Sequence, residues 1–246
     1  QFKYQGNDKG YYGDPFKYFS QDNMGIVGYD SLLQAYEWGV HVVDATEKRS
    51  SYDGERNIQA LYGMIDWYIL DDLRLIGGAR YETTDLMVAS HDPDLDTGEV
   101  QQFDLLPAVN LVYQLFGNMN LRAAYGKTIA RPTMRELAPY PSLDFIGSFI
   151  FLGNPNLKRT IVDNYDLRWE WFPNPGEIIA VSGFYKSFNN SIERVIKNEN
   201  GEINFQNVDD ATVYGLEFEF RKNLGTFYEP LKYFQAGFNV TLIHSE

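Results

Sequence analysis

The residue types that most often carry out chemistry in proteins are few and widely separated in this sequence. Its three histidines, His41, His91 and His244, lie far apart, and none has a partner at the spacing of a catalytic triad or a metal site. The sequence contains no cysteine, which excludes disulfides, thiol catalysis and thiolate metal ligands. We therefore interpret the histidines as surface or loop residues and expect no enzyme, cofactor or metal ion.

One acidic run resembles a calcium-binding loop, because Asp92, Asp94 and Asp96 alternate along the chain as converging carboxylates do. An EF-hand loop requires glycine at its sixth position and an acidic residue at its twelfth. Counted from Asp92, those positions hold Thr97 and Phe103. We interpret this run as a solvated acidic loop, and the sequence leaves open whether it binds an ion.

Composition narrows the class of protein. Of the 246 residues, 44% are hydrophobic, which is enough for a packed core, and 16% are aromatic, a density that favours strands and interfaces. The formal net charge is −13, and the 21 lysines and arginines are scattered along the chain. Because binding to phosphates requires a clustered basic surface, we expect no nucleic-acid partner.

The sequence predicts no membrane-spanning helix that could position a functional site. The longest apolar run, Phe145–Gly153, falls well short of the roughly 18 residues that a spanning helix needs. The N-terminus lacks the basic start and apolar stretch of a signal peptide, so we expect the native chain to begin further upstream.

Instead, side chains alternate between apolar and polar along segments of strand length, as expected for strands with one face in a different environment from the other. Leu73, Leu75, Ala79 and Tyr81 share one face of their segment. The predicted strands are Gly54–Ile69, Leu73–Glu82, Phe103–Phe116, Asn120–Ala130, Asn164–Trp171, Glu177–Val195, Gly215–Arg221 and Leu231–Ile243.

The connections between these segments alternate in length. Those at 70–72, 117–119, 173–176 and 223–230 are compact, whereas those at 87–101, 131–160 and 196–208 are longer. A transmembrane barrel with a wet lumen explains charged side chains along one face of such long strands, whereas a soluble β-sandwich does not. Aromatic residues near strand ends suit the membrane interfaces: Tyr68, Tyr81, Tyr113, Trp169, Trp171 and Phe172.

Four sets of segments carry a family resemblance through their order and spacing. They are YDGERNIQA with GGARYETT (52–60 and 77–84), LLPAVNL (105–111), LRAAYGKTIARP with RELAP and GNPNL (121–132, 135–139 and 153–157), and NYDL with SGFYK, NV and YGLE (164–167, 182–186, 207–208 and 214–217). In this respect the chain resembles the C-terminal half of TonB-dependent outer-membrane receptors.

The resemblance implies an all-β fold, an antiparallel meander that forms part of a large transmembrane β-barrel, with about eight of the 22 strands of such transporters. We expect residues 1–52 to be an extracellular loop or insertion and residues 53–246 to be a partial barrel. The family's N-terminal plug domain and its TonB-contacting segment are not visible in the sequence. The chain therefore resembles a fragment truncated at both ends.

Cargo would be contacted by outer loops and by polar side chains that face the lumen. The alternative roles of these residues are loop folding, strand termination and charge pairing along the inner wall. The candidates are Arg131, Arg135, Glu136, Tyr140 and Asn154 in the long loop, and Arg74, Arg80, Arg122, Arg168 and Glu170 in the lumen.

The resemblance implies a fragment of a receptor, located in the outer membrane and in contact with its lipid, that admits a scarce nutrient when TonB pulls on the plug. The cargo could be a metal chelate, a vitamin, an oligosaccharide or a peptide. Three alternatives stay open: a non-transporting barrel, a barrel-borne hydrolase and a soluble β-rich binding module. A hydrolase would need converging catalytic groups at the outer rim, which the scattered histidines do not supply.

Overall fold

The computed structural model describes residues 2–6, 29–30, 35–36, 40–44, 51–143, 149–199 and 201–246. The chain divides into two compact units, one of residues 1–52 with 90–95 and one of residues 53–89 with 96–246. The first unit contains short antiparallel pairs: β1 (Phe2–Gly6) with β4 (Val40–Asp44), and β2 (Tyr29–Asp30) with β3 (Ala35–Tyr36). These strands lie in the stretch that the sequence predicts to be a loop or insertion.

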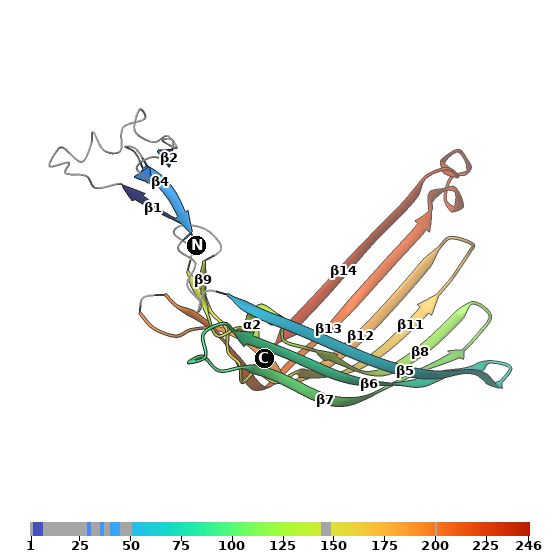
Figure 1. Cartoon of the computed structure of the whole chain (residues 1–246). Coiled ribbons are helices and arrows are strands. Elements are labelled where there is room, and N and C mark those ends of the chain that lie inside the picture. Colours follow the sequence, from blue (N-terminus) through green and yellow to red (C-terminus); the bar gives the residue numbers. More distant parts are fainter. Residues whose placement is uncertain are drawn as a thin grey trace. The chain divides into compact units, whose positions relative to one another are not determined.

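The second unit is built on a ten-stranded sheet (Figure 1). Along the chain, its long strands pair with their neighbours in an antiparallel meander, which confirms the predicted fold class. The long strands are β5 (Tyr52–Leu70), β6 (Leu73–Ser90), β7 (Gly98–Gln114), β8 (Met119–Ala130), β11 (Thr160–Trp171), β12 (Ile178–Ile196), β13 (Ile203–Asn223) and β14 (Gln235–Ser245).

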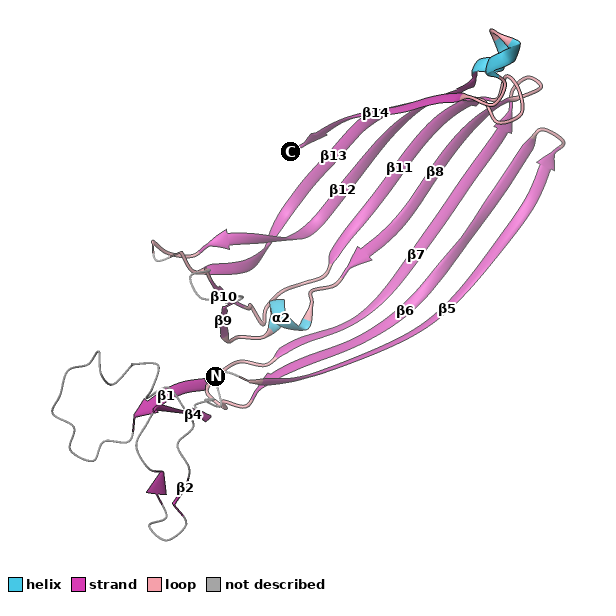
Figure 2. Ribbon diagram, turned by 90° about the horizontal axis from the view of Figure 1, so that it is seen from above, coloured by secondary structure: helices cyan, strands magenta, loops and turns pink. Residues whose placement is uncertain are grey.

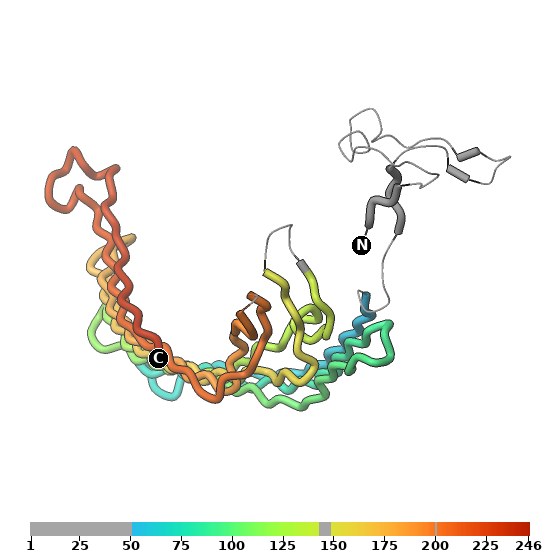
Figure 3. Tube along the Cα trace, turned by 90° about the vertical axis from the view of Figure 1, so that its left-hand side faces the viewer, coloured from blue at the N-terminus to red at the C-terminus, as the bar shows by residue number. Residues whose placement is uncertain are grey.

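The sheet of this unit curls along its width, and residues 131–143 and 149–160 lie on its concave side (Figure 3). Register fixes which side chains share each side, because directly paired residues point to the same face. Tyr125, Tyr165, Tyr185 and Tyr214 form one row on the outer face. A row three positions further along the strands lies on the concave face and includes Arg74, Val112, Arg122, Arg168, Ser182 and Glu217.

Several strands extend further than the alternation predicts. Residues 87–90 belong to β6 and residues 98–101 to β7, while β13 already begins at Ile203. The predicted long connections at 87–101 and 196–208 are therefore shorter than expected, because the strands on either side extend into them. In the opposite direction, β14 begins only at Gln235, because residues 224–231 form the 3₁₀ turns η3 (Leu224–Thr226) and η4 (Glu229–Leu231).

Two glycines of the sheet sit where no side chain fits. A Cβ on Gly78 would overlap the carbonyl oxygen of Gly63, and one on Gly215 would overlap that of Leu242 and the ring of Phe184. Both positions therefore require glycine, because a neighbouring strand approaches closely there. A Cβ on Gly77, in contrast, would make only ordinary contacts, the nearest at 3.8 Å.

The long connection between β8 and β11 folds into a compact structure. After Pro132, the short helix α2 (Met134–Leu137) begins with a capping box in which Thr133 and Glu136 each accept a hydrogen bond from the other's backbone amide. The strands β9 (Pro141–Leu143) and β10 (Ile150–Leu152) follow, and β10 pairs in parallel with the start of β13. Across the described residues, no helix is both long and apolar enough to span a membrane.

Candidate functional site

The concave face carries a continuous network of charges near the short-turn end of the strands. Arg122 Nε donates to Glu170 Oε2 at 2.8 Å, and Arg168 Nε donates to Glu170 Oε1 at 2.8 Å. The other end of the Arg168 guanidinium reaches Glu219 Oε2 at 2.7 Å and Ser182 Oγ at 2.9 Å. Glu170 is buried, so both of its oxygens depend on these arginines for charge compensation.

A second set of charges fastens the long loop to the wall. Glu82 of β6 and Asp104 of β7 are directly paired in register, and both are buried on the concave face. Arg131, at the start of the loop, binds Glu82 and donates to Thr84 Oγ1 at 2.8 Å. Arg159, at its end, donates to Asp104 Oδ1 at 2.6 Å. We call these four charged residues the arginine clamp; it fixes both ends of the loop against neighbouring strands.

Most predicted loop residues help to fold the loop. Glu136 closes the capping box, while Asn154 donates from Nδ2 to the carbonyl oxygen of Phe205 at 2.9 Å. Leu137 and Ala138 are buried, and a Cβ on Gly153 would overlap the Ala138 carbonyl.

Arg135 is exposed. It donates to Ser142 Oγ at 3.2 Å, and its guanidinium lies 5.2 Å from the centre of the Phe151 ring. The backbone amide of Tyr140 donates to Ala138 at 2.8 Å, and the Tyr140 side chain is half-buried. Of the predicted loop residues, Arg135 is thus the charged one that the solvent reaches most freely.

Two predicted wall residues lie in local pairs outside the network of Glu170. Arg74 forms two hydrogen bonds to Asp66, at 2.8 and 2.5 Å, near the turn between β5 and β6. Arg80 Nε donates to Glu82 Oε1 at 2.5 Å and is thereby in contact with the arginine clamp. The structure therefore brings Arg122, Arg168 and Glu170 together and leaves Arg74 apart.

A shallow hollow of about 720 Å³ opens on the concave face between the clamp and the charge network. Small residues form its floor, including Gly78, Ala108, Ala124 and Gly126, and no atom lies within 4 Å of where a Cβ on Gly126 would be. Polar side chains line it: Arg80, Asn110, Thr128, Asn164, Asp166 and Lys186.

Two charges in this concave hollow differ from those of the arginine clamp and of the network around Glu170. Lys186 Nζ donates to Asn164 Oδ1 at 3.1 Å, and within the described part of the chain neither Lys186 nor Asp166 forms an ion pair. They are therefore available to bind an incoming ligand.

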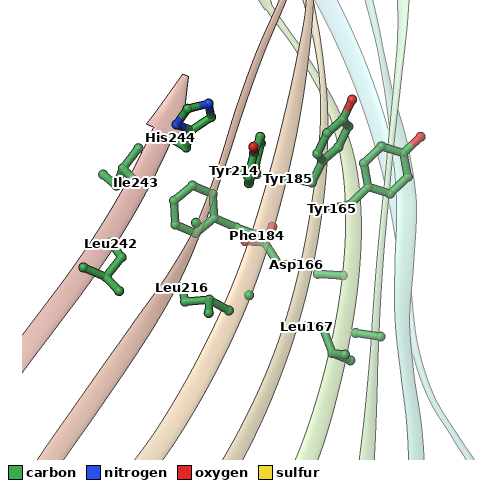
Figure 4. Close-up of a pocket in the computed structure, with 14 residues that line it drawn as sticks. Tyr165, Asp166, Leu167, Phe184, Tyr185, Tyr214, Leu216, Leu242, Ile243 and His244 are labelled. Atoms are coloured by element: carbon green, nitrogen blue, oxygen red, sulfur yellow. The ribbon is translucent and has the colours of Figure 1, made fainter. Parts of the chain in front are cut away.

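The outer face has a different character. A hollow of about 750 Å³ lies beside the tyrosine row, around the small residues Ala123 and Gly183. Figure 4 shows Leu167, Leu216 and Leu242 on three different strands beside Tyr165, Tyr185 and Tyr214. Many large apolar side chains on this face are exposed, as expected of a surface in contact with lipid.

Sequence reasoning missed several residues of this site. Asp104 and Arg159 are 55 residues apart, and only the strand register shows that they meet. The position of Asp104 on the polar face of its predicted strand could have indicated that it needs a basic partner. Asp166 and Lys186 also occupy inward positions of predicted strands, and they lie in the NYDL and SGFYK segments, which indicate the family but assign no role to either side chain. Where the structure describes side chains, no group of three or more His, Cys, Asp or Glu could hold a metal ion.

Comparison with known proteins identifies the wall. Residues 1–244 match the family model described as TonB dependent receptor-like, beta-barrel. The chain belongs to the TonB-dependent receptor family. It is therefore a segment of an outer-membrane β-barrel, with the outer face toward lipid and the concave face toward the lumen. A search of curated protein sequences gave no match.

Solved structures of such receptors share the fold. The copper transporter OprC is 16% identical, with a TM-score of 0.59, 89% of this chain covered and 32% of that one. The alcaligin outer-membrane receptor FauA from Bordetella pertussis is 14% identical, with a TM-score of 0.54, 79% of this chain covered and 31% of that one. The hemophore receptor HasR from Serratia marcescens is 13% identical, with a TM-score of 0.55, 74% of this chain covered and 35% of that one. This chain thus spans about a third of their lengths.

Proposed function

We propose that this chain forms part of the barrel wall of a receptor that imports a scarce nutrient across the outer membrane. Family membership supports this proposal most directly, and the polar concave face opposite an apolar outer face agrees with it. In this proposal a plug domain outside this chain occludes the lumen, and TonB moves the plug to admit the cargo. Residues 1–52 would form an extracellular loop or insertion.

Within the wall, we propose that cargo is contacted by charged side chains that are exposed on the loop or that line the concave hollow. Arg135 is exposed at the loop, and Asp166 and Lys186 lie in the concave hollow without ion-pair partners among the described residues. Arg131, Arg168 and Glu170 are instead occupied by contacts within the wall. We propose binding and transport rather than catalysis as the role of the chain.

The cargo class is the open part of the proposal. A metal chelate, a vitamin, an oligosaccharide and a peptide all suit a lumen that presents both signs of charge. Solved relatives include an alcaligin receptor and a copper transporter, which makes metal-containing cargo the first class to test here.

The test is growth of cells that carry or lack the full receptor gene, with each cargo class supplied as the limiting nutrient. We expect growth on one class to require both the receptor and TonB. Growth that is independent of TonB would refute the import mechanism and favour a non-transporting barrel.

Point variants then test the wall itself. Asp166→Asn and Lys186→Met should reduce uptake several-fold, whereas Asp85→Asn, an exposed carboxylate on the outer face of β6, should leave it unchanged. Equal uptake by all three variants would remove the concave hollow from the cargo path.

A further inference from the structure

The connection between β13 and β14 departs from the other turns at its end of the sheet. The turn between β5 and β6 is formed by Asp71 and Asp72 alone. Residues 224–234, in contrast, fold into η3 and η4 before β14 begins (Figure 2). We call residues 224–234 the aromatic turn, since Phe227, Tyr228, Tyr233 and Phe234 are 76%, 64%, 86% and 61% exposed, respectively.

A buried carboxylate holds the aromatic turn in place. Glu177 accepts hydrogen bonds from Lys222 Nζ at 2.7 Å, Thr226 Oγ1 at 2.8 Å, Asn174 Nδ2 at 2.8 Å and the Asn223 backbone amide at 3.2 Å. Its side chain is only 1% exposed. A buried carboxylate requires hydrogen-bond donors, and these four connect the turn to the ends of β12 and β13.

Strand parity shows on which side of the sheet this anchor lies. Ile179 pairs with Phe220, and both point outward, on the same side as the tyrosine row. Because side chains alternate along a strand, Lys222 of β13 also points outward. Glu177, one residue before β12, contacts the Lys222 ammonium and therefore lies on the same side. Thr226 hydrogen-bonds Glu177, and the Lys222 ammonium lies 5.7 Å from the centre of the Phe227 ring. The aromatic turn therefore folds back toward the outer face and covers the ion pair there.

The surroundings of the aromatic turn indicate what it contacts. The apolar outer face of β13 and β14 is continuous with the aromatic turn. The ring centres of Phe220 and Phe238, a directly paired couple close to the turn, lie 5.3 Å apart. Its charges balance, because Lys222 pairs with Glu177 and Lys232 pairs with Glu229 at 2.8 Å. An aromatic surface without net charge, continuous with a lipid-facing wall, suits the boundary between lipid headgroups and acyl chains.

We propose that the aromatic turn is a preformed anchor that inserts into the headgroup boundary of the adjacent phospholipid leaflet. Phe227, Tyr228, Tyr233 and Phe234 enter the boundary, and Glu177 keeps the turn folded against the outer face. The anchor fixes the height of this part of the barrel in the membrane, and it operates whichever cargo the receptor carries.

Spin-label depth measurements test this anchor in the full receptor, with its other cysteines removed and reconstituted in phosphatidylcholine vesicles. The label is placed at Tyr233→Cys, with Leu167→Cys as the lipid-facing reference and Asp94→Cys as the aqueous reference. We expect the ratio of oxygen to nickel-chelate accessibility at Tyr233 to be several-fold higher than at Asp94 and to approach that at Leu167. Adding phosphatidylglycerol should not change it, since the turn has no net charge.

Two results would overturn the proposal. A ratio equal to that at Asp94 would place the turn in water, and protection from both reagents would place it under protein. A second variant tests the role of Glu177: Glu177→Gln should lower the ratio at position 233 toward the aqueous value. The matched control Glu229→Gln removes an exposed carboxylate of the same turn and should leave the ratio unchanged; equal effects of the two variants would refute the role assigned to Glu177.

Discussion

Removing one arginine of the arginine clamp should loosen the long loop without unfolding the wall. In Arg159→Met, the carboxylate of Asp104 stays buried, at 5% exposed, and loses its partner at 2.6 Å. Its second oxygen, Oδ2, is buried without a hydrogen-bond partner among the described residues. Breaking a buried ion pair in this way costs about 3 kcal/mol, at the low end of the range for such pairs.

The matching change at the other end of the loop should cost less. In Arg131→Met, Glu82 keeps its contact with Arg80 at 2.5 Å, so we expect a loss of about 1–2 kcal/mol. Replacing both members of the first pair, in Asp104→Leu with Arg159→Met, should restore most of the stability, because no uncompensated charge is left in the wall.

Hydrogen exchange of the full receptor measures this cost locally. The reporter is the backbone amide of Asn154, which donates to the carbonyl of Glu136 at 2.6 Å and is exposed only when the loop opens. A loss of about 3 kcal/mol corresponds to exchange that is roughly a hundred-fold faster. The control Arg221→Met removes an arginine that is 51% exposed, and it should change exchange little. Equal exchange in Arg159→Met and Arg221→Met would refute the clamp.

Three further predictions concern the sheet and its aromatic turn. Hydrogen bonds, of which the one from Lys222 contributes most, lower the pKa of Glu177 from 4.5 to about 2. The ionised carboxylate therefore stabilises the turn fully above about pH 4.5, and this stabilisation should be lost as the pH falls toward 2. Amide hydrogen exchange of the turn should show this loss, and Glu177→Gln should abolish the pH dependence. Gly215→Val should lower the temperature at which the full receptor loses its folded, detergent-resistant form, because its side chain meets Leu242 and Phe184, whereas Gly126→Ala in open space should not. Residues 1–246 expressed alone should aggregate without detergent, which sedimentation can check, since β5 and β14 have open edges and the outer face is apolar.

The long strands were predictable because their two faces meet different environments. Period-two alternation placed Arg122, Arg168 and Glu170 on one side, and the structure joins these residues in one network. The ends of the strands were less predictable. Beyond the membrane the outer face no longer has to be apolar, so the alternation fades while the hydrogen-bonded ladder continues, as in β6 up to Ser90.

The aromatic turn and the arginine clamp escaped sequence reasoning for different physical reasons. Residues 224–234 contain apolar side chains at strand-like density, yet Pro230 and the buried carboxylate of Glu177 favour tight turns over a ladder. The clamp depends on which residues of β6 and β7 are opposite each other, and on where a loop of nearly thirty residues returns to the wall. Neither feature is encoded in a local pattern.

Pairing along the inner wall also bears on how selectivity could arise. The charge of Arg74 is neutralised by Asp66. Within the charge network and within the arginine clamp, arginines and carboxylates neutralise each other in the same way. A wall whose charges are already compensated attracts a charged cargo weakly, because each new contact must first displace an existing one. Such a wall suits a conduit better than a binding site. Recognition by this segment should therefore rest on the hollow with Asp166 and Lys186, where a ligand gains contacts without breaking an ion pair.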